Sequence, residues 1–171
     1  YRDTEGELDE YDIDLDEFSI IHFGSATGFL PGPLQAAYQG LLQKALQKNI
    51  VISFDPNYRH LLFKNDVQTF IDQSWNFLNC CHFFKVSDEE AILITGAATL
   101  DDAAALLLEK TTATFAITLG KEGTMLGMNG KTMIIESIPV KPVDTTGAGD
   151  AFVGAVLFQL STKSFEEIKS L

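Results

Sequence analysis

Short apolar runs of strand length alternate with longer segments of helical periodicity along most of this chain, and this alternation limits the folds it can adopt. The strand-length runs are residues 18–23, 50–54, 82–86 and 114–118. The segments between them in which apolar residues recur at helical spacing are residues 33–48, 66–79, 88–95 and 100–110. Strands that are separated by helices predict an α/β fold with a largely parallel sheet covered on both faces.

The pattern changes in the last third of the chain. Residues 124–128 and 131–137 flank Asn129-Gly130, the strongest two-residue signal for a β-hairpin, which predicts an antiparallel piece near one edge of the sheet. An apolar helix is expected over residues 148–160, and Ser164 with Glu167 forms a capping box that opens one more helix. Residues 18–171 are therefore interpreted as one α/β domain.

Charge is concentrated at the start of the chain. The sequence has 24 acidic and 12 basic residues, and residues 1–17 contain nine of the acids with one base, so this segment is interpreted as a solvated acidic connector. Basic residues do not cluster, so no nucleic-acid partner is expected. Apolar runs stay well short of the roughly 20 residues that cross a bilayer, so no membrane association is expected either.

Cysteine and histidine usage bears on the compartment and on metal binding. Cys80 and Cys81 are adjacent, and neighbouring cysteines rarely satisfy disulfide geometry, so we expect reduced thiols in a cytoplasmic protein. The three histidines lack the spacing of metal ligands.

A glycine-containing loop runs directly into the apolar helix at residues 143–152. Glycine lets the backbone approach a ligand closely, and the first turn of a helix presents unpaired N–H groups at the positive end of the helix dipole. This combination predicts an anion site suited to phosphate. Asp150 lies within it; a carboxylate there either complements the dipole or acts as a base on an attacking hydroxyl.

Residues 144–155, DTTGAGDAFVGA, resemble the C-terminal signature of the ribokinase-like, or PfkB, carbohydrate kinases. The resemblance implies a three-layer α/β/α sandwich. It assigns Gly147, Ala148 and Gly149 to an anion hole for the transferring phosphoryl group and Asp150 to the catalytic base, in contact with the sugar. It also implicates Asp144 and Thr146 in binding a monovalent cation such as K⁺.

Two further segments resemble nucleotide-site motifs of the same family. The turn TLGKEG at residues 118–123 resembles the ATP-binding turn, and a plain glycine-rich turn is the alternative. The resemblance implies that ATP contacts Thr118, Gly120, Lys121 and Gly123, in addition to Gly149. Ser87-x-x-Glu90 resembles the NxxE motif, whose glutamate helps to organise Mg²⁺ through water, and Ser87 would adjoin ATP. Serine departs from the usual asparagine, and S-x-x-E is also a capping box.

Two segments point to the sugar. DPNYR, residues 55–59, resembles a segment of fructokinases and 2-keto-3-deoxygluconate kinases, which implies that Asn57 and Arg59 contact the substrate; a surface turn is the alternative. HFGS, residues 22–25, resembles the strand end that lines the sugar pocket in fructokinase-like members, which implicates Gly24 and Ser25.

The resemblance implies ATP- and Mg²⁺-dependent phosphorylation of a sugar hydroxyl, with a fructokinase-like enzyme as the main hypothesis. The alternatives are a 2-keto-3-deoxygluconate kinase or other PfkB kinase, a non-catalytic nucleotide-binding remnant, and a dinucleotide-binding oxidoreductase. For the last, Phe152 stands where the third glycine of the fingerprint belongs. The family's N-terminal sugar-binding and lid part and its C-terminal end are not in this sequence. Because lids often carry the dimer contacts, the resemblance leaves open whether the protein is a homodimer.

Overall fold

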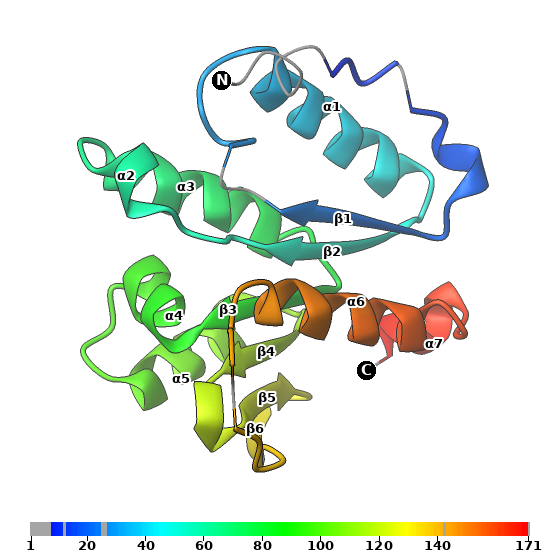
Figure 1. Ribbon diagram of the computed structural model, residues 1–171. Helices are drawn as coiled ribbons and strands as arrows, with labels where there is room; N and C mark the ends of the chain where they lie inside the picture. Colours follow the sequence, from blue (N-terminus) through cyan, green and yellow to red (C-terminus); the bar gives the residue numbers. More distant parts are fainter. Residues whose placement is uncertain (1–7, 12, 25–26, 142, 171) are drawn as a thin grey trace.

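The computed structural model describes residues 8–11, 13–24, 27–141 and 143–170. Within this part of the chain, a six-stranded sheet has its strands in sequence order (Figure 1). The strands are β1 (Ile20–Gly24), β2 (Val51–Asp55), β3 (Phe83–Ser87), β4 (Thr114–Thr118), β5 (Thr124–Met128) and β6 (Lys131–Ile135). β1 to β4 pair in parallel, whereas β5 is antiparallel to both of its neighbours, so the mostly parallel sheet with an edge hairpin is confirmed.

Helices fill the connections between the strands, largely where periodicity predicted them. They are α1 (Pro33–Gln47), α2 (His60–Phe63), α3 (Val67–Leu78), α4 (Asp88–Thr95), α5 (Leu100–Lys110), α6 (Ala148–Leu160) and α7 (Phe165–Lys169). The side chain of Thr99 caps α5 by accepting from the amide of Asp102, and Asn49 follows α1 with a φ of 55°. α2 was not predicted, because four residues are too few to show a helical period.

No single helix among these residues is both long and apolar enough to cross a membrane. α4 and α5 reach that length and apolar composition only when they are taken together, and a bend of 63° separates them.

The hairpin between β5 and β6 forms at the Asn-Gly pair. Asn129 has a φ of 52° and Gly130 a φ of 71°, the positive values that a two-residue turn of this class requires. β6 ends at Ile135, two residues earlier than its apolar run suggested, and it is exposed along its whole length. The chain then runs through residues 136–147 before α6 begins.

Side chains of the central strands alternate between two apolar layers. Phe54, Phe84 and Phe115 are fully buried on one face, in a core built with α1, α3, α4 and α5. The intervening residues Val51, Phe83 and Ala116 belong to a second cluster, completed by Leu160 of α6 and Ile168 of α7. Helices therefore cover both faces of the sheet, which is the three-layer arrangement (Figure 1).

The described part of the acidic N-terminal segment lies against α1 rather than extending into solvent. Leu15 is 3% exposed and joins the main core. Nζ of Lys44 lies 3.5 Å from the carboxylate of Glu10 and 4.0 Å from the ring centre of Tyr11, and Lys48 pairs with Asp16. Lys44 on α1 and Lys48 directly after it attract the acidic residues, and burial of Leu15 holds the segment in place.

Candidate active site

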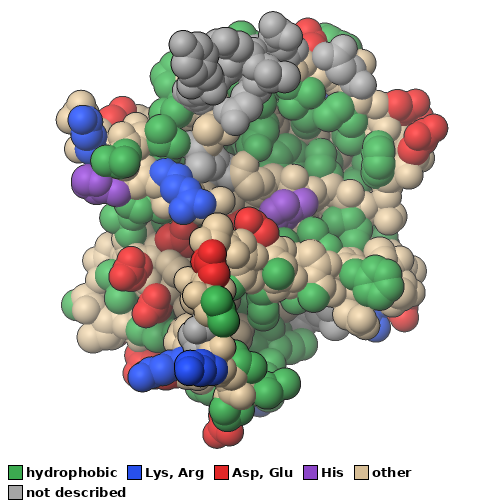
Figure 2. Space-filling view, in the orientation of Figure 1, with side chains coloured by type: hydrophobic (Ala, Val, Ile, Leu, Met, Phe, Trp, Pro, Cys, Tyr) green, Lys and Arg blue, Asp and Glu red, His purple; other side chains and the backbone are tan. Residues whose placement is uncertain are grey.

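Polar side chains replace apolar ones toward the carboxyl ends of β1, β2 and β3 on the face that α6 covers. Because successive side chains of a strand point to opposite faces, Asp55 lies on the same face as Val51, and Lys85 on the same face as Phe83. His22 is paired in register with Ser53, on the same face. The carboxyl ends of parallel strands are where open α/β sheets bind ligands. Figure 2 shows charged side chains of both signs and a histidine near the N-terminal end of α6.

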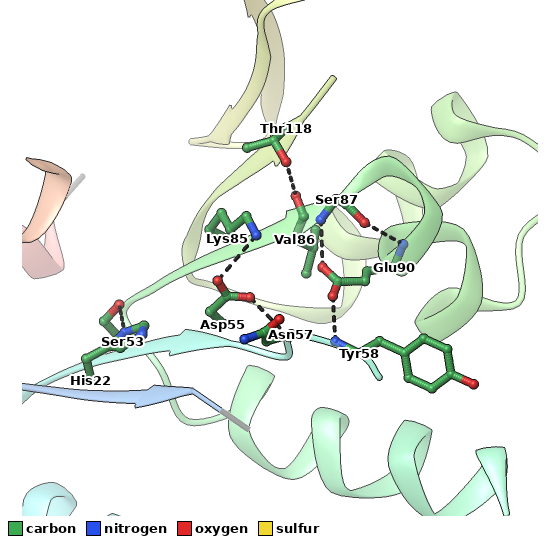
Figure 3. Close-up of polar contacts among 10 residues, drawn as sticks. All are labelled: His22, Ser53, Asp55, Asn57, Tyr58, Lys85, Val86, Ser87, Glu90 and Thr118. Atoms are coloured by element: carbon green, nitrogen blue, oxygen red, sulfur yellow. Dashed lines mark hydrogen bonds and ion pairs between the residues drawn. The ribbon is translucent and has the colours of Figure 1, made fainter. Parts of the chain in front are cut away.

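Lys85 and Asp55 form a buried ion pair between adjacent strands. Nζ of Lys85 lies 3.3 Å from Oδ2 of Asp55, and their side chains are 10% and 5% exposed (Figure 3). The other oxygen, Oδ1 of Asp55, accepts a hydrogen bond from the amide of Asn57 at 3.1 Å. Burial raises the pKa of Asp55, and the positive charge of Lys85 opposes that rise.

Glu90 joins α4 to the loop that follows β2. Its carboxylate accepts from the amide of Ser87 at 2.8 Å and from the amide of Tyr58 at 2.7 Å, while Oγ of Ser87 accepts from the amide of Glu90 (Figure 3). The capping box is therefore present, and Glu90 is buried. The proposed contacts of Glu90 with Mg²⁺ and of Ser87 with ATP stay predictions.

The loop before α6 leads into a helix N-terminus that no side chain caps. Gly147 has a φ of 75° and precedes the helix, whose N-terminus has no side-chain cap. Oδ1 of Asp144 accepts from the amide of Thr146 at 2.8 Å, and this hydrogen bond holds the pKa of Asp144 below its usual value. Asp150 lies in the first turn of α6 and is exposed to solvent.

The predicted nucleotide turn faces this loop across a cavity of about 550 Å³. Thr118, Gly120 and Gly123 line one side of it, and Ala148 and Gly149 line the other. The structure thus brings together four of the predicted ATP-site residues from two distant segments. Lys121, within the same turn, is exposed, and neither it nor Ser87 lines the cavity.

The predicted sugar-site residues lie at the ends of β1 and β2. Asn57 is half-buried with a φ of 46°, and Arg59 is exposed at the start of α2. Gly24 ends β1, and its carbonyl accepts from the hydroxyl of Tyr38 at 2.6 Å. Ser25 lies outside the described residues.

His22, the third residue of β1, is close enough to Asp150 and Lys85 to be influenced by their charges. Its Nδ1 is 3.0 Å from Oγ of Ser53. Desolvation lowers the pKa of His22; the negative charge of Asp150 acts against this and the positive charge of Lys85 adds to it. The imidazole is therefore influenced by charges from the strand ends and from the first turn of α6.

Two charged site residues were missed as functional candidates from the sequence. Lys85 interrupts the apolar strand FFKVS, and Asp55 ends the buried strand VISFD. A lysine in a buried strand needs a partner, so its position is itself a signal. Finding that partner required knowing that β2 lies next to β3.

The described residues hold no group of three or more His, Cys, Asp or Glu side chains arranged to bind a metal ion. The dinucleotide-binding alternative is also disfavoured. Its glycine loop connects a strand directly to a helix, whereas residues 136–147 separate β6 from α6 here.

Comparison with known proteins agrees with this geometry. The sequence profile of the pfkB family of carbohydrate kinases matches residues 2–169. Probable fructokinase-4 of Arabidopsis thaliana is 31% identical over 168 residues, which cover 94% of this chain and 50% of that protein. The chain spans about half the length of the curated relatives that it matches first.

The fold also resembles those of solved carbohydrate kinase structures. Fructokinase from Vibrio cholerae O395, in a form with fructose, ADP and calcium bound, matches 92% of this chain and 51% of its own with a TM-score of 0.81 and 26% identity. Aminoimidazole riboside kinase from Salmonella enterica, complexed with aminoimidazole riboside and an ATP analog, matches 95% of this chain and 57% of its own with a TM-score of 0.82 and 26% identity.

Proposed function

This chain belongs to the pfkB family of carbohydrate kinases, and we propose that it forms the catalytic part of an enzyme that transfers the γ-phosphoryl group of ATP to a sugar hydroxyl. One observation carries the proposal. The uncapped N-terminus of α6, with Asp150 exposed in its first turn, faces the cavity that the predicted nucleotide turn also lines. This arrangement supports the proposal, because Gly149, next to Asp150 in the first turn of α6, lines a space large enough for a nucleotide.

We propose fructose as the substrate, on the strength of the fructokinases among the relatives. A keto-sugar acid is the second candidate, because Arg59 is exposed at the start of α2 and a guanidinium binds a carboxylate bidentately. Asn57 lies two residues away and would bind sugar hydroxyls in either case.

In the proposed mechanism Asp150 accepts the proton of the attacking hydroxyl, and the amides of the first turn of α6 stabilise the negative charge on the phosphoryl oxygens. The exposed carboxylate of Asp150 is open to a substrate on the solvent side, while the backbone of Gly147 to Gly149 has no side chain that would obstruct phosphate, apart from the methyl group of Ala148. Positioning and charge stabilisation are the main contributions that a protein makes to phosphoryl transfer.

The carboxylate of Glu90 fits a role toward Mg²⁺ through water. Each of its oxygens accepts one backbone amide, which leaves acceptor capacity on both. Bound Mg²⁺ supplies neutralisation of phosphate charge. Asp144 and Thr146 are the proposed ligands of a monovalent cation such as K⁺, although the carboxylate of Asp144 already accepts hydrogen bonds within its own loop. The free thiols of Cys80 and Cys81 agree with the proposed cytoplasmic location.

The test is ADP release by the native full-length protein with Mg·ATP and fructose, ribose or 2-keto-3-deoxygluconate. We expect sugar-dependent release that falls about 10²- to 10⁴-fold in Asp150→Asn, with nucleotide binding retained. Asp101→Asn, which changes an exposed carboxylate on α5, should release ADP at the native rate. If no sugar stimulates release from the folded protein, the kinase proposal fails; if Asp150→Asn is as fast as the native protein, the assignment of the base fails.

A further inference from the structure

Lys85 occupies a position that apolar side chains fill elsewhere in the core of the sheet. It is the third residue of β3 and is 8% exposed. On the same face, α6 packs its C-terminal half against Val51 and Phe83 at the other end of the strands. A buried ion pair seldom stabilises a fold more than well-packed apolar residues of similar volume would. The pair of Lys85 with Asp55 therefore calls for an explanation other than stability.

The ammonium group of Lys85 lies directly under the first turn of α6. A Cβ atom placed on Gly149 would lie 3.1 Å from Nζ of Lys85 and 3.7 Å from its Cε. Gly149 is one of the residues that line the cavity facing the predicted nucleotide turn. The absence of a side chain at residue 149 thus lets the ammonium approach the backbone of the first turn of α6 closely.

Lys85 has unused hydrogen-bonding capacity in this direction. An ammonium carries three donors, and Asp55 is its one hydrogen-bond partner among the residues that the structure describes. Asp55 is itself fixed by the amide of Asn57, so the ammonium is held at one side and has donors left for an anion at the other. The opposite charges of Lys85 and Asp55 offset each other until such an anion arrives.

We propose that Lys85 is a catalytic residue that binds an oxygen of the phosphoryl group in transfer, and that Asp55 is the positioning residue that aims its ammonium at the N-terminus of α6. The proposal rests on the proposed kinase function and deepens it. In the step concerned, the hydroxyl oxygen of the sugar forms a bond to the γ-phosphorus. The bond from that phosphorus to the β–γ bridging oxygen breaks with its electron pair, which leaves ADP, and the hydroxyl proton passes to Asp150. Lys85 gives up no proton and forms no covalent bond; its charge stabilises the phosphoryl oxygens.

The test compares Lys85→Met, Lys85→Arg and the control Lys131→Met, an exposed lysine on β6, in the native full-length protein. Calorimetry measures the affinity for AMP, ADP and ATP, and steady-state assays measure kcat and KM for ATP. In Lys85→Met we expect AMP affinity within twofold of the native value, ATP affinity about 10- to 100-fold weaker, and kcat about 10²- to 10³-fold lower. Lys85→Arg should recover part of the ATP affinity, and Lys131→Met should change neither quantity.

Two results would overturn the proposal: a kcat/KM for ATP in folded Lys85→Met within threefold of the native value, or an equal loss of AMP and ATP affinity. The second result would mean that Lys85 only maintains the fold. If Lys85→Met does not fold because Asp55 is left unpaired, Lys85→Met/Asp55→Asn replaces it, with the same expectations. The calorimetry also tests this proposal independently of the kinase function. The affinities for AMP, ADP and ATP can be measured even if the protein turns over no sugar.

Discussion

Asp55 on β2, Lys85 on β3 and Glu90 on α4 are buried and held by polar contacts within the chain. In contrast, Asp144 in the loop before α6 and Asp150 in the first turn of α6 are exposed. The two regions meet where Gly149 lies over Lys85. In the first region charges are fixed by hydrogen bonds before any ligand binds, and in the second the reacting carboxylate is open to solvent. This contrast suggests a division of labour between rigid charges that position the substrate and accessible groups that react with it.

The largest difference in stability between the two regions is expected when one carboxylate is removed from each. Asp55→Ala leaves Lys85 buried without its partner and should lower the free energy of unfolding by about 3–5 kcal/mol. Asp150→Ala removes an exposed group and should change it by less than about 1 kcal/mol. Urea unfolding measures both, and Asp55→Ala/Lys85→Met should recover much of the loss. Equal losses in the two single variants would remove the distinction between the regions.

A smaller effect is expected from Glu90, which links two segments of the buried region. Glu90→Ala leaves the amides of Ser87 and Tyr58 without their acceptor and should cost about 1–3 kcal/mol. Glu89→Ala, at the exposed neighbouring position on α4, should stay within about 0.5 kcal/mol of the native protein. Thermal unfolding of the two variants gives the comparison, and a Glu90 variant as stable as its neighbour would show that the carboxylate does not hold the loop after β2.

In the exposed region, stability should depend more on backbone conformation than on side-chain contacts. Gly147→Ala places a Cβ on a residue with a φ of 75° and should destabilise the protein by about 1 kcal/mol. Gly154→Ala lies inside α6 with open space around it and should stabilise by about 0.5–1 kcal/mol. Opposite shifts in melting temperature are expected. Two shifts of the same sign would argue against a conformational requirement for glycine before the helix.

The sequence predicted local features of both regions and missed the contacts between them. Residues 100–110 and 148–160 were assigned to helices with the bounds that the structure shows, because Thr99 and the glycine loop mark where those helices begin. The first strand was placed too early, since the apolar Phe18 is 53% exposed and lies outside β1. Apolarity alone does not distinguish a buried residue from an exposed one at the end of a strand.

The same limit applies to the site. The anion loop and Asp150 could be identified because their residues are contiguous. The hydrogen bond from Tyr58 to Glu90 joins residues 32 apart, and the ion pair of Asp55 with Lys85 joins residues 30 apart. Both depend on which strands are neighbours, and a hydrophobic pattern leaves strand order open. The lysine in β3 was the available signal, because a buried charge demands a partner somewhere in the fold.

The smallest expected effect is a shift in the titration of His22, which is influenced by one charge from each region. Its pKa in the folded protein lies below the ordinary value of 6.5, chiefly through desolvation; Asp150 raises it and Lys85 lowers it. Asp150→Asn should therefore lower this pKa further, and Lys85→Met should raise it. NMR titration of the imidazole measures the shifts, and the exposed variants Asp101→Asn and Lys131→Met are the matched controls.

The lowered pKa of His22 also determines how its contribution to stability changes with pH. Because the folded state binds the proton of His22 less tightly than the unfolded chain, the contribution of this residue is complete above pH 6.5 and is lost as the pH falls through the lowered pKa. Asp150→Asn should enlarge that loss and Lys85→Met should reduce it. If neither variant moves the titration of His22, the strand ends and the first turn of α6 do not lie close enough to act on one substrate. The proposed separation into positioning and reacting groups would then have to be abandoned.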